Sequence, residues 1–233
     1  MWERLQSVEV DPNGAVKDEE TLYFLNSATG QRMGAITVSK WHRLRRSKLR
    51  SLLTEGLDIR YDEKLVDISY SEDGYRATAH FADVTTATGR LIVGADGAHS
   101  AVRRSLLGVK AAASQRLPFA ATFVQARFSR ERALFLRQWH PLYLAGVHPD
   151  GFFSFHGIQS APDAEDPESW TFFFYISWNY SVEEQDKTAD WTNAQRLKQV
   201  QALAKGFADP WKSAFAWVPD DHLVWYVGLA DWD

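Results

Sequence analysis

The chain has 233 residues, of which 45% are hydrophobic and 24% charged, and these values exclude a wholly disordered protein. It contains no Cys, which excludes disulfides, thiolate metal sites and a Cys nucleophile, and its net charge of −4 argues against a binder of polyanions. No apolar run reaches the roughly 20 residues that span a bilayer, and the N-terminus lacks the apolar segment of a signal peptide. We therefore expect a cytoplasmic protein without a membrane span.

The N-terminal part predicts strands followed by a basic helix. Residues 21–25 and 35–38 read as strands around a turn-rich connection at 26–30. A basic stretch at residues 40–50 then leads into a helix with an expected N-cap at Ser47 and an expected C-cap at Gly56. This start leaves Arg46 at the entrance of the helix.

The next segment predicts strands, a hairpin and the first half of a βαβ unit. Residues 57–61, 65–70 and 75–81 read as strands, with a hairpin turn at 71–74. The short apolar run at 90–95 is typical of a strand buried on both faces. A turn at Asp96 and Gly97 follows, and then a helix that ends near Gly108.

The second half of the chain predicts an antiparallel sheet. Four strands at 119–128, 142–147, 152–158 and 170–178 follow one another without long helices between them. An exposed acidic loop at 160–169, a helix at 192–207 and a strand at 223–232 complete the pattern. The predicted fold class is α/β plus α+β, and the boundary between the two parts falls near residue 110.

The turn at Asp96 carries the strongest local signal for chemistry. It places a carboxylate at the end of a predicted buried strand, which is where ligands bind in open α/β sheets. Gly97 allows a close approach to the backbone, and the next helix presents free N–H groups to an anion. From local physics alone, a ligand site and an ordinary helix cap remain equally open.

Two motifs resemble those of flavin-dependent aromatic monooxygenases, the para-hydroxybenzoate hydroxylase-like family. That family has an apolar strand that ends in Ala-Asp-Gly, followed at fixed spacing by Ser and Arg. The matching residues here are Ala95, Asp96, Gly97, Ser100 and Arg103. The family's Arg-x-x-Leu helix motif, with a further Leu four residues on, is matched by Arg46, Leu49 and Leu53, and the tail at 229–233 resembles fungal members.

The resemblance implies a partial Rossmann-like FAD-binding domain at 1–110 and an antiparallel substrate-domain sheet at 111–233 that runs back toward the FAD domain. Arg46 would neutralise the FAD diphosphate, with Arg43 as the substitute if the helix register differs. Asp96 and Gly97 would approach the FAD, while Arg103 would pair within the protein. The implied reaction uses NAD(P)H and O₂ to hydroxylate an aromatic or other small organic substrate, and no catalytic residue can be named from the sequence.

The sequence also departs from the family. No two of its 14 Gly are separated by a single residue, so the Gly-x-Gly-x-x-Gly loop is missing, and no Gly-Asp dipeptide occurs. We therefore expect an internal segment of a monooxygenase that binds FAD poorly by itself and turns over no substrate.

Three alternatives compete with this interpretation. One is an inactive remnant of the fold that holds no flavin, and another is a module that binds nucleic acid or other anionic partners through the basic helix. The third is an enzyme of the same superfamily that epoxidises its substrate or only oxidises it. A metal site built from His140, His148 and His156 is a weaker signal, because these residues lack carboxylate companions in the sequence. We expect neither nucleic-acid binding nor a metal.

Overall fold

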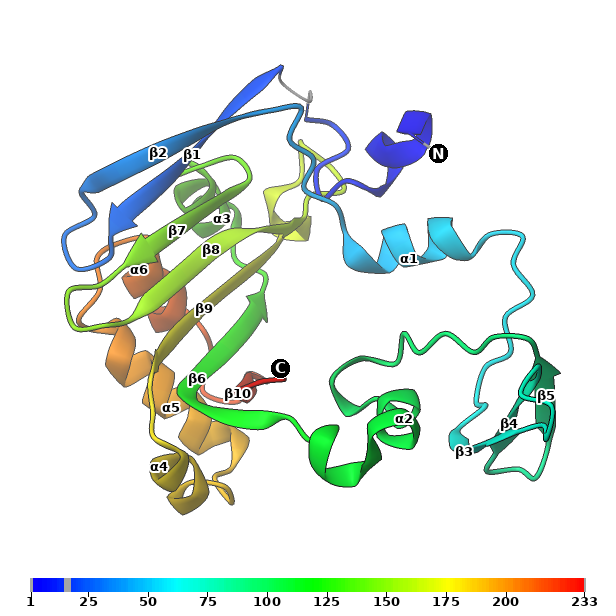
Figure 1. The fold of residues 1–233 in the computed structure, drawn as a ribbon. Helices are drawn as coiled ribbons and strands as arrows, with labels where there is room; N and C mark the ends of the chain where they lie inside the picture. The colour runs from blue at the N-terminus through cyan, green and yellow to red at the C-terminus, as the bar shows by residue number, and fades with distance from the viewer. Residues whose placement is uncertain (1, 15–17, 233) are drawn as a thin grey trace. The chain divides into compact units, whose positions relative to one another are not determined.

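The computed structural model describes residues 2–14 and 18–232, which form two compact units (Figure 1). The first unit comprises residues 1–55 and 118–229, and the second comprises residues 56–117 and 230–233. The fold is mixed α/β, as predicted, with one large and one small sheet. The functional roles assigned to residues 1–110 and 111–233 stay predictions.

The large sheet has seven strands in the order β10-β6-β9-β8-β7-β1-β2. The strands are β1 (Glu19–Asn26), β2 (Arg32–Ser39), β6 (Gln115–Ala126), β7 (Tyr143–Val147), β8 (Phe153–Ser160), β9 (Thr171–Asn179) and β10 (Trp225–Asp231). The pairs β1–β2, β6–β9, β7–β8 and β8–β9 are antiparallel, whereas β1 and β7 run parallel. The predicted strands and their antiparallel pairing in the second half of the chain are confirmed.

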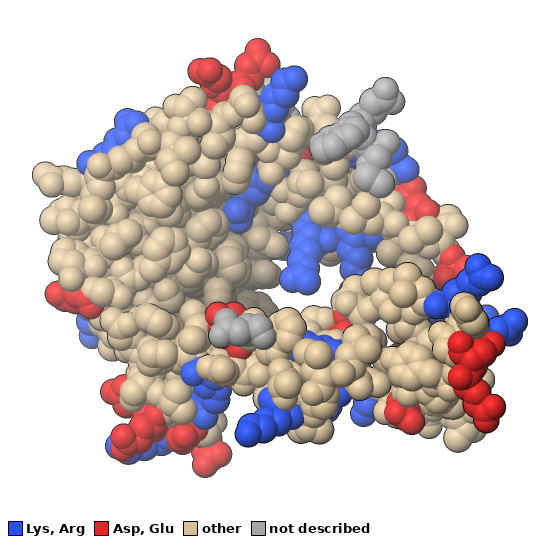
Figure 2. All heavy atoms as spheres, viewed as in Figure 1, with Lys and Arg blue, Asp and Glu red and all other residues tan. Residues whose placement is uncertain are grey.

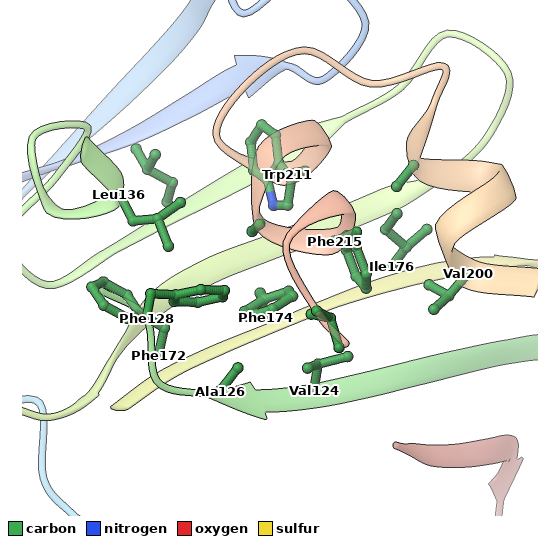
Figure 3. Packing of buried hydrophobic residues seen from close by; sticks show 14 of the residues in the cluster. Val124, Ala126, Phe128, Leu136, Phe172, Phe174, Ile176, Val200, Trp211 and Phe215 are labelled. Atoms are coloured by element: carbon green, nitrogen blue, oxygen red, sulfur yellow. The ribbon is translucent and has the colours of Figure 1, made fainter. Parts of the chain in front are cut away.

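One face of the large sheet is covered by helices. Along β9, every second side chain from Phe172 to Trp178 is buried, as strict alternation of the pleat requires. These side chains pack against three helices, α3 (Arg130–Arg137), α5 (Asn193–Ala204) and α6 (Trp211–Ala216). Figure 3 shows Leu136 of α3, Val200 of α5 and Phe215 of α6 around the side chains of Phe172, Phe174 and Ile176. This layer is the main hydrophobic core of the chain.

The basic helix α1 (Arg46–Thr54) begins two residues earlier than an N-cap at Ser47 predicts. Ser47 lies inside it, and the N-cap position is Arg45, whose side chain makes no capping hydrogen bond. The entrance is instead fixed through the backbone, because the Arg45 N–H donates to the Val8 carbonyl at 2.7 Å. Leu52 packs against Leu5 and Val8 around the 3₁₀ helix η1 (Trp2–Val8), an element that the sequence did not predict.

The second unit holds a three-stranded antiparallel sheet and a helix. The strands are β3 (Leu65–Tyr70), β4 (Ala77–Phe81) and β5 (Thr86–Gly89), and the helical elements are η2 (Gly97–His99) and α2 (Ala101–Ala111). The hairpin between β3 and β4 is confirmed. The backbone of Gly108 is left-handed, with φ of 79°, and marks a kink near the end of α2.

The prediction of a buried strand at 90–95 is wrong. This segment is irregular, and Leu91 and Val93 are each 77% exposed. A strand needs hydrogen-bonded neighbours, and no strand of the described residues pairs with this segment. The predicted strand at 57–61 is absent from the described chain for the same reason. Asp96 consequently does not follow a central strand.

Two further short helical elements complete the description of residues 2–14 and 18–232. They are the helix α4 (Val182–Lys187) and the 3₁₀ helix η3 (Pro167–Ser169), of which η3 lies in the exposed acidic loop. The sequence did not predict the positions of α3 and α6. Both α4 and α5 begin with a capping box, at Ser181 and Thr192 respectively. None of the helices within residues 2–14 and 18–232 is both long and apolar enough to cross a bilayer.

Candidate functional site

The face of the large sheet opposite the helices carries a continuous set of aromatic rings, here called the aromatic face. Its members are partly buried and come from four adjacent strands: Phe123 of β6, Phe173 and Tyr175 of β9, Phe153 and Phe155 of β8, and Tyr143 of β7. They are the alternate residues between the fully buried ones, so the pleat turns them away from the core.

The strand register brings these rings into direct contact. Tyr175 lies opposite Phe123 on one side and Phe155 on the other. The ring centroids are 4.8 Å apart in the first pair and 5.5 Å apart in the second, where the rings are stacked. Phe155 and Tyr143 are stacked with centroids 5.3 Å apart. Cross-strand aromatic pairs of this kind stabilise a sheet and leave a flat apolar surface.

Few charges lie near this region. Figure 2 shows that the surface over β7, β8 and β9 is almost wholly uncharged in this view, with charged side chains mainly at its margins. A flat ligand could lie on such a surface by stacking and by apolar burial, as in most small-molecule sites. The sequence analysis placed aromatic strands in the substrate sheet but did not identify which rings share this face.

Arg43 is the cation that approaches the aromatic face. Its guanidinium carbon lies 5.1 Å from the centroid of Phe155 and 5.8 Å from that of Tyr143. Its Nε donates to the Ile158 carbonyl at 2.9 Å. Burial lowers the pKa of Arg43 to about 10, partly offset by Tyr143, so the guanidinium keeps its charge at neutral pH.

A cavity of about 220 Å³ lies beside Arg43, entirely within the first unit. The apolar part of its wall is formed by Trp41, Pro141 and Leu142. The ring centroids of Trp41 and Tyr143 are 5.8 Å apart. The lining also contains three carboxylates and a second arginine: Glu9, Asp11, Glu20 and Arg137.

The carboxylates of this cavity all have basic partners. The Glu9 carboxylate is 2.6 Å from Nδ1 of His42, and Asp11 accepts from Arg137. The Glu20 carboxylate is 3.7 Å from Nε2 of His140. Asp11 is therefore matched by a charged guanidinium, whereas Glu9 and Glu20 lie beside imidazoles.

Arg46, the predicted diphosphate ligand, is exposed at the first turn of α1. It makes no hydrogen bond or ion pair with any described residue, so its guanidinium is available to a ligand. A helix entrance with a free guanidinium fits a diphosphate in charge and in hydrogen-bonding geometry.

The Asp96–Gly97 turn is also exposed, but its carboxylate is engaged. Asp96 accepts a hydrogen bond from the Ser100 hydroxyl and another from the Ala101 N–H at 2.6 Å. These bonds, led by that from Ser100, hold the pKa of Asp96 below its ordinary value. Gly97 has φ of +76°, and a Cβ built there would meet nothing within 4 Å, so the backbone is open to a ligand. The N-cap residue of α2 is therefore Ser100 rather than Asp96, and Asp96 supports the same helix start by accepting from the N–H groups of Ala101 and Val102. The Asp96 side chain is exposed, so its carboxylate can also accept from a ligand.

The predicted site residues are only partly brought together. Asp96 and Gly97 are adjacent, whereas Arg46 belongs to the other compact unit, so a shared FAD site stays a prediction. Arg103 pairs within the protein, as expected: it donates to the carbonyls of Ala98 and Ala112. No cluster of three metal-binding side chains was found in the described parts of the chain.

Comparison with known proteins identifies relatives for most of the chain. The family described as "FAD binding domain" matches residues 13–217. The FAD-dependent monooxygenase phnB of Penicillium herquei is 32% identical over 89% of this chain and 50% of its own length. The FAD-dependent monooxygenase cctM of Talaromyces islandicus is 32% identical over 98% of this chain and 55% of its own length. The chain thus spans about half the length of the curated relatives it matches.

Solved structures show the same fold at low identity. The 2,6-dihydroxypyridine-3-hydroxylase of Arthrobacter nicotinovorans has a TM-score of 0.71 at 18% identity, over 98% of this chain and 59% of that one. HpxO of Klebsiella pneumoniae, solved with FAD and uric acid, has a TM-score of 0.67 at 14% identity, over 90% of this chain and 51% of that one.

Proposed function

Since the chain belongs to the family of FAD-binding monooxygenases, we propose that it forms the substrate sheet and part of the cofactor site of an FAD-dependent monooxygenase. The substrate would be a small aromatic compound, with NAD(P)H and O₂ as co-substrates. One oxygen atom of O₂ would enter the substrate and the other would leave as water.

The aromatic face is the observation that carries this proposal. Six rings on one sheet surface provide a platform on which an aromatic substrate can lie flat and out of water. When bound, FAD would supply the redox and oxygen-transfer chemistry, and the protein would orient the substrate and exclude solvent. The sheet therefore needs no acid–base dyad of its own for this role.

Two elements would hold the cofactor. Arg46 would pair with the diphosphate, since its guanidinium is exposed and has no partner among the described residues. The Asp96–Gly97 turn would offer its open backbone and its remaining carboxylate acceptor sites to another part of FAD. With no Gly-x-Gly loop in the sequence, these contacts alone would bind FAD weakly.

The experiment is a titration of the purified chain with FAD, followed by isothermal calorimetry. We expect weak binding that Arg46→Gln weakens further, by about tenfold, because one charge-assisted contact to a diphosphate is lost. Arg50→Gln removes an exposed cation from the same helix and is the matched control. Equal effects of the two substitutions would exclude Arg46 as the diphosphate ligand, and undetectable binding would favour the inactive-remnant alternative.

A further inference from the structure

The turn at residues 11–14 presents an Asn-Gly pair at the surface. The Gly14 N–H donates to the Asp11 carbonyl at 3.2 Å, which closes a four-residue turn with Asn13 exposed in it. The Asp11 carboxylate also accepts from the Asn13 N–H at 3.3 Å, as in an Asx turn. Both hydrogen bonds are long, so they hold the turn only loosely.

The carboxamide of Asn13 is also loosely held. Its Nδ2 donates to the Pro162 carbonyl at 3.3 Å, and its side chain makes no second hydrogen bond with the described residues. This bond is exposed, and water competes for both of its groups, so its net contribution to stability is small. The carboxamide carbon of Asn13 can therefore rotate toward the backbone nitrogen of Gly14, which no side chain of residue 14 shields.

Asn26 shows the opposite arrangement. Its Oδ1 accepts from the N–H groups of Ala28 and Thr29, so the carboxamide is fixed away from the next peptide nitrogen. That nitrogen belongs to Ser27, which is fully buried and donates to the Val147 carbonyl at 3.0 Å. The structure thus protects one Asn and leaves another open, and the open one is also the only Asn in the sequence that precedes Gly.

We propose that Asn13 is a site of spontaneous deamidation, which places a new carboxylate at the edge of the cavity that Gly14 lines. The Gly14 nitrogen loses its proton to hydroxide and attacks Cγ of Asn13. A C–N bond forms and closes a five-membered succinimide, while the Cγ–Nδ2 bond breaks and the leaving nitrogen takes a proton from water to become ammonia. Water then opens the ring at either carbonyl, which gives Asp or isoaspartate. In sum, the amide and one water become an acid and ammonia, without any change of oxidation state.

The modification changes the electrostatics of this edge of the cavity. Asp11 is paired with Arg137, and the product adds a second negative charge next to the Asp11 carboxylate. The product also lacks the N–H donor that contacts the Pro162 carbonyl, in a loop that carries Asp163 as well. Repulsion therefore replaces attraction between the turn and this loop, and the cavity edge becomes more acidic as the chain ages.

The test follows ageing of the full chain by peptide mapping. Trypsin places Asn13 in the peptide at 5–17 and Asn26 in the peptide at 18–32, so one digest measures both sites by mass spectrometry. We expect the folded chain to convert Asn13 at least about tenfold faster than Asn26, because Gly14 leaves its nitrogen unshielded whereas Ser27 is buried. The rate at Asn13 should rise in mildly alkaline buffer, since the attacking nitrogen must lose its proton. Equal rates at the two sites, or no conversion of Asn13, would overturn the proposal.

Unfolding separates the role of the structure from that of the sequence. In urea, Asn26 should convert at least about tenfold faster than in the folded chain, because its protection is lost. Asn13 should change its rate by less than about threefold, because the folded turn already leaves it free to react. A rate at Asn13 that rises on unfolding as much as that at Asn26 would contradict the proposal, since it would show that the turn protects this residue.

Variants assign the chemistry to the Asn-Gly pair. Asn13→Gln keeps an amide donor but would have to close a six-membered ring, so it should show no conversion at this position. Gly14→Ala should slow conversion by about tenfold, because its Cβ crowds the approach to the nitrogen. On an anion-exchange column, the aged unmodified chain should elute with fresh Asn13→Asp, whereas aged Asn13→Gln should elute as it did when fresh. Conversion that persists undiminished in Gly14→Ala would exclude attack by this nitrogen. None of these measurements involves flavin, so their outcome is independent of the proposed function.

Discussion

The guanidinium carbon of Arg196 lies 3.5 Å from the centroid of the Tyr226 ring, and this contact joins α5 to β10. Arg196 is only 5% exposed and donates both terminal amino groups to Thr188, at the end of α4. The residue therefore links two helices and an outer strand through a cation–π contact and two hydrogen bonds.

Substitution of Arg196 by Ala should lower the free energy of unfolding by about 2–4 kcal/mol, because it removes the ring contact and two hydrogen bonds to Thr188 and leaves a cavity where the buried side chain was. Lys198→Ala is the matched control, since it removes an exposed cation from the same helix and should change stability by less than about 0.5 kcal/mol. Urea unfolding followed by circular dichroism measures both. Similar effects of the two substitutions would show that the buried link contributes little.

Gly146 should tolerate no side chain. A Cβ built at this position in β7 would lie 2.3 Å from Oγ of Ser27 and 2.6 Å from the Trp211 ring, both in the buried layer. Gly146→Ala should therefore destabilise the chain by about 1–3 kcal/mol through overpacking. Gly34→Ala in β2 is the control, because its Cβ would meet nothing within 4 Å. Thermal unfolding should show a clear loss for the first variant alone.

The stability of the chain should fall in acid partly through His156. Its imidazole is buried against Phe172 and Phe174, and burial, reinforced by the charge of Arg43, lowers its pKa to about 3. Between about pH 3 and 6.5, the unfolded chain binds a proton that the native chain does not. This one group should therefore cost about 1.4 kcal/mol of stability per pH unit below about 6.5.

The check on His156 compares urea unfolding at about pH 7.5 and 5.5 for the unmodified chain and for His156→Gln. The variant should lose less stability between these two pH values, by about 1.4 kcal/mol. His99→Gln, at an exposed histidine, should keep the original pH dependence. An unchanged pH dependence in His156→Gln would contradict the shifted pKa.

Asp96 should stabilise the start of α2 whether or not FAD is present. Its carboxylate accepts from the N–H groups of Ala101 and Val102, so Asp96→Ala should speed hydrogen exchange of both amides several-fold. The same loss should follow protonation, since the pKa of Asp96 lies below that of the unfolded chain and the cap is lost as pH falls through it. Asp58→Ala, at an exposed carboxylate without such bonds, should leave these rates unchanged.

Local signals in the sequence predicted much of the fold. The aromatic run at 170–178 predicted strand β9 but not which of its sides is buried, and the helix predicted from residue 192 starts at a capping box formed by Thr192 and Gln195. These features depend on neighbours within a few residues. The apolar run at 90–95 failed as a prediction because a strand also depends on distant partners, which its own residues do not specify.

The candidate site was harder to predict for the same reason. The basic stretch at 40–50 was visible, but the sequence could not say which arginine lies against aromatic rings. Arg43 does so because its Nε meets the carbonyl of Ile158, more than a hundred residues away. Trp41 and Tyr143 were missed, although the alternation in the strands could have separated the six rings of the aromatic face from the core rings.

The parallel pairing of β1 with β7 has a consequence for how the chain acquires its fold during synthesis. Phe24 lies opposite Ala145, so β1 leaves the ribosome long before its partner does. The strands β3, β4 and β5, in contrast, pair within one short continuous stretch. The small sheet can therefore close early, whereas β1 has only β2 as a neighbour until the central strands emerge. During that interval the edge of β1 that later pairs with β7 has unpaired backbone groups, which favours association with other extended chains.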